Sequence, residues 1–198
     1  MDSFGGLNAT RQVEIDLITD AYRISGMVQT RFGRVTDILN QLLGQHLAVE
    51  QATISEHADP GAALAAPSAI VDVSSILLLA APGLTGEASS EMRIPKRAVK
   101  ALLALPPIRV TGTIHVPMGS RPLDGLLNVT DRFLAMTDVT ISSGQFPELG
   151  RTVEAAAIGR ARAQVLLVAD DERPDELLAD VLDERTAEAW LRSDNVPR

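Results

Sequence analysis

The sequence contains no cysteine and has few aromatic residues. Without cysteine, neither a disulfide framework nor a thiolate metal site is possible, and a reducing compartment is the expected setting. Aromatic residues make up 3% of the chain and apolar residues 45%, so the core must be built mainly from aliphatic side chains. A groove that binds nucleic acid by stacking its bases needs more aromatic rings than this.

Positive charge and long hydrophobic runs are also scarce. The formal net charge of -8 at pH 7 disfavours a surface that follows a phosphate backbone. No stretch approaches the about 20 apolar residues of a membrane helix. A signal peptide has a basic segment followed by an apolar run, and residues 1–20 do not have this pattern. We therefore expect a cytoplasmic protein with no nucleic-acid partner and no integral membrane segment.

The chain does contain an internal repeat, because residues 22–55 and 108–142 follow the same pattern. The two copies are 86 residues apart at their glycines and 87 apart from their arginines onward, so one inserted residue accounts for the difference. The corresponding positions are Gly26 and Gly112, Arg34 and Arg121, Asp37 and Asp124, Leu39 and Leu126, and Thr53 and Thr140.

Each copy has the pattern of strand, helix, strand and strand. In the first copy, residues 22–28 alternate between apolar and polar, which predicts a strand. Apolar residues within 35–43 recur at helical spacing, and Gly44 is well placed to end that helix. A strand follows at 46–56. The nearly continuous apolar run at 70–81 predicts a strand that is buried on both faces.

These patterns predict an α+β, β-rich fold in which two pseudo-symmetric β-α-β-β repeats form a small barrel or sandwich, with a C-terminal amphipathic helix. One repeat of about 60 residues has too little core to be stable alone, so sharing a core is favoured. Two separate barrels are the alternative. The expected segments are a lead-in at 1–20, repeat 1 at 21–81, a linker with a short helix at 82–107, repeat 2 at 108–170, and an acidic helix at 171–198.

Two charged pairs occupy equivalent places on the predicted helices, Arg34 with Asp37 and Arg121 with Asp124. The spacing of three residues puts each pair on one helix face. Such a duplicated site could bind an anionic ligand through its arginines. Alternatively, each pair is an ion pair whose carboxylate suits the start of a helix. We favour this structural role, because both halves retain it.

Polar residues elsewhere have structural explanations as well. Asn40 and Asn128 lie where their helices end, and asparagine tolerates the conformation that ends a helix. Gly26 and Gly112 lie inside strands, where they predict a bend or close backbone approach, as at a barrel corner. Lys96, Arg97 and Lys100 form a basic cluster that a partner or a lipid headgroup could use, but we favour a solvated helix face.

No motif for catalysis or for cofactor binding occurs. The histidines His46, His57 and His115 are not at metal-ligand spacing, and His115 alternates with apolar neighbours, which predicts a solvent-facing strand position. A phosphate-binding glycine loop and a nucleophile elbow are both absent. We therefore predict no catalytic residue, no metal and no cofactor.

The predicted C-terminal helix has an apolar stripe that must be buried somewhere. The stripe includes Leu178, Leu182 and Trp190. It could pack on its own chain or on another subunit, and Trp190 would be the natural anchor of an interface. We therefore expect a protein partner or a second copy of the chain.

The second repeat resembles a module found in uncharacterised bacterial proteins, over about 60 residues of each half. The first repeat departs from the pattern, because Glu50 and Gln51 replace Thr137 and Asp138. The resemblance brings no known activity. The residues that carry it are Arg121, Asp124, Leu127, Asn128, Thr137, Asp138, Thr140 and Ile141.

Taken together, the sequence favours a non-enzymatic interaction or assembly protein, a scaffold or an adaptor, that forms homo-oligomers. The alternative is a small-molecule-sensing regulatory domain, with its ligand between the repeats near Arg34 and Arg121. An enzyme that uses Asp37, Asp124 or Asp138 as its acid or base is the least favoured.

Overall fold

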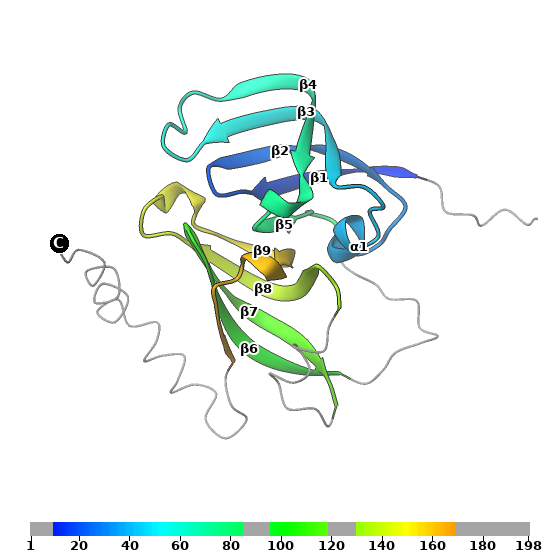
Figure 1. The fold of residues 1–198 in the computed structure, drawn as a ribbon, viewed down its shortest axis with the longest axis vertical. Coiled ribbons are helices and arrows are strands. Elements are labelled where there is room, and N and C mark those ends of the chain that lie inside the picture. Colours follow the sequence, from blue (N-terminus) through cyan, green and yellow to red (C-terminus); the bar gives the residue numbers. More distant parts are fainter. Residues whose placement is uncertain (1–9, 85–95, 119–129, 169–198) are drawn as a thin grey trace, which may run out of the picture.

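The computed structural model describes residues 10–84, 96–118 and 130–168. They form a ten-stranded antiparallel sheet with the order β10-β6-β7-β8-β9-β5-β1-β2-β3-β4 (Figure 1). The strands are β1 Arg11–Ile18, β2 Tyr22–Thr30, β3 His46–Glu56, β4 Leu64–Asp72, β5 Leu78–Ala80, β6 Lys96–Leu105, β7 Ile108–Pro117, β8 Phe133–Ser142, β9 Arg151–Gly159 and β10 Val165–Val168. The helical elements are α1 Val35–Asn40 and the short 3-10 turns η1 Val73–Ser75, η3 Pro147–Leu149 and η4 Arg160–Arg162.

The prediction of a small barrel or sandwich was wrong, because the described residues form one large open sheet. Its edge strands, β4 and β10, lie at opposite ends and do not pair. Each half contributes five strands to the sheet, and α1 is the one α-helix within the described ranges. The helix expected at 171–198 lies outside the described residues.

The two halves nevertheless have the same strand pairing. The first half has the order β5-β1-β2-β3-β4 and the second has β10-β6-β7-β8-β9. In each half the last strand returns to pair with the first, so Leu79 lies opposite Leu17, and Leu166 lies opposite Leu103. β5 also pairs with β9 of the other half, where Leu79 lies opposite Ala157. This β5–β9 junction joins the two halves into one sheet.

The junction is buried on both faces. Leu78 and Ala80 belong to the apolar cluster of the second half, whereas Leu79 between them belongs to the cluster of the first half. Because successive strand residues point to opposite faces, the two cores lie on opposite faces of the sheet at β5. The predicted burial of both faces is confirmed for β5, whose residues are at most 1% exposed. The predicted 70–81 strand is divided by η1, and its first part belongs to β4.

Polar contacts also cross the junction. Asp16 of β1 pairs with Arg151 of β9 at 2.8 Å and with Arg23 of β2 at 3.0 Å. Burial lowers the pKa of Arg151, Asp16 opposes this shift, and Arg23 adds to it. Arg162 of η4 also pairs with Asp20, between β1 and β2. These ion pairs fix the first two strands of one half against the end of the other.

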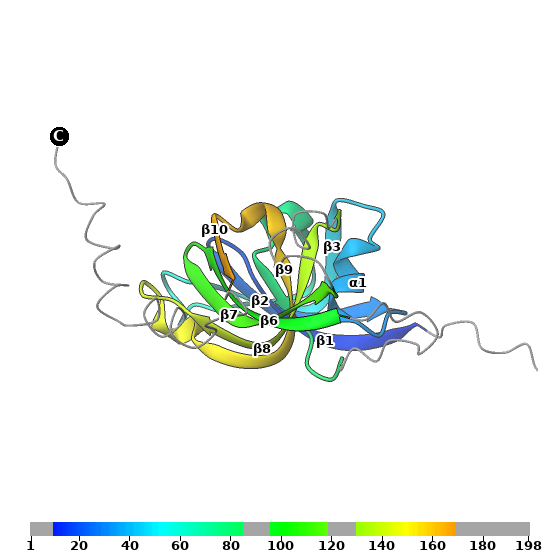
Figure 2. The ribbon, with the colours of Figure 1, turned by 90° about the horizontal axis from the view of Figure 1, so that it is seen from below.

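The close backbone approach predicted at Gly26 and Gly112 is confirmed, but it occurs at β-bulges in an open sheet. The pairing shifts register at both glycines. A Cβ atom would lie 2.6 Å from the Glu50 oxygen at Gly26 and 2.8 Å from the Thr137 oxygen at Gly112. The bulged residues opposite, Gln51 and Asp138, both have positive φ, at 50° and 52°. The bulges increase the local twist and help each half to curve, as Figure 2 shows for β6, β7 and β8.

Several predicted boundaries were wrong. The short helix expected within 82–107 is instead strand β6, which pairs with β7 along its whole length. Consecutive residues of a strand point to opposite faces, so Arg97 is separated from Lys96 and Lys100, and the three do not form one cluster. Strand β9, within repeat 2, was not predicted from the sequence. The lead-in at 1–20 contains β1, a strand of the first core.

Candidate functional site

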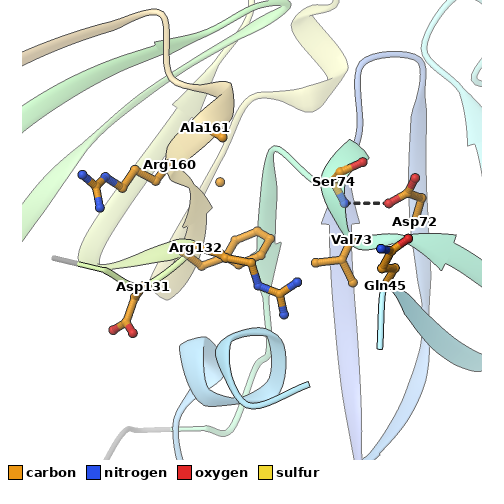
Figure 3. A pocket seen from close by; sticks show the side chains of 10 residues that line it. Gln45, Asp72, Val73, Ser74, Asp131, Arg132, Arg160 and Ala161 are labelled. Carbon is orange, nitrogen blue, oxygen red and sulfur yellow. Dashed lines mark hydrogen bonds between the residues drawn. The ribbon is translucent and has the colours of Figure 1, made fainter. Parts of the chain in front are cut away.

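A cavity of about 680 Å³ opens between the two halves. One side is formed by the end of β4 and by η1, and the other by the chain that enters β8 and by η4 (Figure 3). Its lining residues are Gln45, Asp72, Val73, Ser74, Asp131, Arg132, Phe133, Gly159, Arg160 and Ala161. A ligand site between the repeats was expected near Arg34 and Arg121, but Arg34 does not line this cavity and Arg121 lies outside the described residues.

The polar groups of this cavity are largely engaged in structural contacts. Arg132 donates hydrogen bonds to the carbonyl oxygens of Leu39 and Leu42, at 2.9 and 3.1 Å. These bonds hold the guanidinium group at the C-terminal end of α1, where a positive charge is favourable. The Asp72 carboxylate accepts a hydrogen bond from the Ser74 backbone N–H at 2.8 Å, which lowers the pKa of Asp72. Asp131 and Arg160 add one negative and one positive charge to the lining.

The predicted pair Arg34 and Asp37 lies at the start of α1. Arg34 is exposed at the N-cap position and makes no capping bond with its side chain. Asp37 lies in the first turn and is half-buried. The equivalent residues Arg121 and Asp124 lie outside the described residues, as do Asn128, Leu178, Leu182 and Trp190. A duplicated arginine site therefore stays a prediction.

Asp37 lowers the stability of the fold at neutral pH. Burial raises its pKa, the nearby charge of Arg34 opposes this shift, and Asp131 adds to it. A carboxyl whose pKa is raised on folding destabilises the folded state above that pKa, and the penalty disappears as the pH falls through it.

We therefore expect Asp37→Asn to raise the free energy of unfolding at pH 7 by less than about 1 kcal/mol, because partial exposure screens the charge. The gain should vanish as the pH falls towards the ordinary carboxyl pKa of about 3.9. Urea unfolding at several pH values tests this, with the exposed Asp59→Asn as a control. A loss of stability at pH 7 would contradict the assignment.

Asn40 was predicted to cap α1, but the structure gives it a different role. Its side chain forms two hydrogen bonds with the backbone of Phe133, donating to the carbonyl oxygen at 3.0 Å and accepting from the N–H at 2.9 Å. It therefore attaches the helix of the first half to the first residue of β8 in the second half. This contact was not visible in the sequence, because 93 residues separate its partners.

Replacing Asn40 with alanine should remove both bonds and leave two half-buried backbone groups unpaired. We expect Asn40→Ala to lower the free energy of unfolding by about 1–3 kcal/mol. Gln41→Ala, at the exposed neighbouring residue, should have little effect. Equal urea midpoints for Asn40→Ala and the native chain would show that the attachment is unimportant.

The histidines do not form a metal site. His57 is buried, contacts the Thr19 carbonyl at 3.0 Å and packs against Phe146. His115 is exposed, as predicted, and lies 3.1 Å from the Thr137 hydroxyl. Among the described residues, no three histidine, cysteine, aspartate or glutamate side chains are grouped so as to hold an ion. Within the same ranges, no helix has the length and apolar character needed to cross a membrane.

The two sheet edges are the second candidate site. Both edge strands expose large apolar side chains, and neither carries a charge between Leu64 and Val71 or along β10. The exposed side chains are Leu64 at 64%, Ile70 at 75%, Val165 at 45% and Leu167 at 40%. The sequence did not reveal this surface, because an apolar edge strand has the same pattern as a buried one.

Comparisons with family models, with curated proteins and with solved structures find no match to this chain. The site must therefore be interpreted from its own residues.

Proposed function

We propose that this chain is a non-enzymatic assembly protein, a scaffold or an adaptor, that binds other protein chains through the edges of its sheet. The observation that supports the proposal is a pair of edge strands that are uncharged between Leu64 and Val71 and along β10. They expose Leu64, Ile70, Val165 and Leu167. A sheet edge offers unpaired N–H and C=O groups, and an extended segment of a partner can add to it as a further strand.

These edges lack most of the features that keep edge strands from associating. Natural edges commonly carry lysine, inward-pointing charges or proline. Here Pro67 in β4 is such a feature, and the rest of that strand up to Val71 is uncharged. Both edges are therefore suited to pairing with another chain.

The cellular setting belongs to the proposal. The lack of cysteine supports a reducing compartment, and we place the protein in the bacterial cytosol. A second binding surface around Leu178, Leu182 and Trp190 stays a prediction from the sequence. Both surfaces are compatible with the acidic net charge of -8, which favours basic partners.

Mutation of the exposed edges tests the proposal in the full chain. Ile70→Lys and Val165→Lys put a charge on each edge without disturbing a buried side chain. Leu43→Lys is the control, because Leu43 is fully exposed and belongs to neither edge strand. We expect the edge variants to lose self-association or partner binding, measured by light scattering and by pull-down, and the control to keep it. A native chain that stays monomeric and binds no protein would overturn the proposal.

A small-molecule-sensing role is the second candidate, and the cavity between the halves favours it. An anionic metabolite could enter beside Arg160. A thermal-shift screen with nucleotides and carboxylic acids tests this role. We would expect a stabilising ligand to lose its effect in Arg160→Gln, and a shift that survives this change would place the ligand elsewhere.

A further inference from the structure

Among the described residues, the two edge strands pair on one side only, and they are the equivalents of the two strands that meet at the junction. β10 has the same place in the second half as β5 has in the first, and β4 has the same place in the first half as β9 has in the second. The turns that follow β4 and β9 repeat as well. Val73 N–H bonds to the Gln45 carbonyl at 2.9 Å, and Arg160 N–H bonds to the Arg132 carbonyl at 3.0 Å. The described part of a single chain therefore contains both strands of a second such junction without pairing them.

The exposed apolar residues occupy the positions of this unmade counterpart. At the junction, Leu78 and Ala80 of β5 pack in the core of the opposite half and are at most 1% exposed. Their equivalents on β10 are Val165 and Leu167, which are 45% and 40% exposed. On β5 the face with these side chains packs against the other half, whereas on β10 none of the described residues forms a strand on the outer side.

The same relation holds for the other edge. Ala157 of β9 lies in the core of the first half and is fully buried. Its equivalent on β4 is Ile70, which is 75% exposed. Its neighbours Ala69 and Val71 face the core of their own half. Each edge strand therefore exposes side chains whose equivalents are buried at the β5–β9 junction.

We propose that β10 of one copy pairs with β4 of a second copy, repeating the β5–β9 junction between chains. Transferring the junction's register sets Leu166 opposite Ile70, Val165 opposite Val71, and Leu167 opposite Ala69. This inference specifies the partner and the pairing, and it rests on the proposed assembly function. Val165 and Leu167 then enter the first-half core of the second copy.

One difference between β9 and β4 limits the length of the pairing between copies. Gly159 at the end of β9 lies so close to β5 that a Cβ atom would be under 3.0 Å from the Ile76 carbonyl oxygen. Its equivalent on β4 is Asp72, which has a side chain. The pairing between copies therefore ends at Val71, and Pro67 limits it at the other side. Between these limits the four residues of β10 can pair with four residues of β4, and so short a contact predicts an association that depends on concentration.

Cysteine cross-linking tests the register directly, because the native chain has no cysteine. At the junction the Gly159 N–H bonds to the Leu77 carbonyl, so the pair equivalent to Leu167 and Ala69 falls at a narrow position. Cα atoms are about 4.5 Å apart there, within the range of a disulfide. Mixed Ala69→Cys and Leu167→Cys chains should form the cross-linked heterodimer on mild oxidation.

The control is Ala65→Cys mixed with Leu167→Cys. Ala65 is on the same face of β4 but about 13 Å further along the strand. We expect roughly tenfold more heterodimer from the proposed pair than from this control, because only the proposed register brings the sulfurs within bonding distance. Equal yields from the two mixtures would overturn the pairing.

Light scattering on the full chain separates this inference from the proposed function. We expect masses well above the 21.1 kDa of one chain for the native protein and for Leu43→Lys, but 21.1 kDa for Ile70→Lys. Association that survives Ile70→Lys and gives no selective cross-link would overturn the pairing and leave assembly by another surface. A monomer at every concentration would also overturn the pairing, and the assembly function would then depend on a different protein binding the edges.

Discussion

Replacing Leu79 with alanine should lower the free energy of unfolding by about 3–5 kcal/mol, the upper part of the range for such changes. Leu79 is fully buried, and its strand pairs with β1 on one side and with β9 on the other. A cavity there is enclosed by backbone on both sides, so the surroundings cannot easily collapse into it. The side chain also belongs to the first core at the point where both halves meet.

The repeat provides a matched comparison for this change. Leu166 holds the equivalent place on β10, but it is half-buried at an edge with a strand on one side only. We expect Leu166→Ala to cost about half as much as Leu79→Ala, because less apolar surface leaves water. Urea unfolding of dilute protein measures both changes, with Leu43→Ala as a variant without effect. Equal losses at Leu79 and Leu166 would show that the junction is not the most tightly packed part of the sheet.

The strand pattern was largely predictable from the sequence, but the sheet was not. Alternation of apolar and polar residues at 22–28 correctly indicated part of β2, since side chains alternate between the faces of a strand. The same alternation does not say which strand lies beside it. The open ten-stranded order depends on β5 pairing with β9, residues almost 80 positions away, and no local signal encodes such a pairing.

Strand β6 shows how local preference misleads. Its residues include Lys96, Lys100 and several alanines and leucines, which are good helix formers. The structure makes it a ten-residue strand because it pairs with β7 along one side and with β10 along the other. Hydrogen bonding and burial in the second core outweigh an intrinsic preference of a few tenths of a kcal/mol per residue.

The candidate site residues also include some that the sequence revealed and some that it did not. The sequence singled out Arg34 and Asp37, because charged residues at helical spacing are easy to recognise. It did not reveal the edge formed by Ile70 and Val165, because exposure depends on which neighbours a strand has. Asn40 lies between these cases, since its importance was visible but its partner Phe133 was not.

Gly159 is the residue at which a single added methyl group should have the largest effect. It is buried at the end of β9, where its N–H donates to the Leu77 carbonyl at 2.8 Å. A Cβ atom would lie under 3.0 Å from the Ile76 carbonyl oxygen. Backbone atoms cannot rotate away as a flexible side chain can, so β9 and β5 would have to separate.

We therefore expect Gly159→Ala to lower the free energy of unfolding by about 3 kcal/mol, because overpacking of this kind forces the backbone to shift. Gly61→Ala is the matched control, since its nearest neighbour would be 3.7 Å away in an exposed turn. The separation of strands should also weaken the ion pair between Asp16 and Arg151, which spans the same junction. If Gly159→Ala unfolds at the same urea concentration as Gly61→Ala, the two halves are not joined by a close β5–β9 contact, and a second copy would have no such junction to repeat.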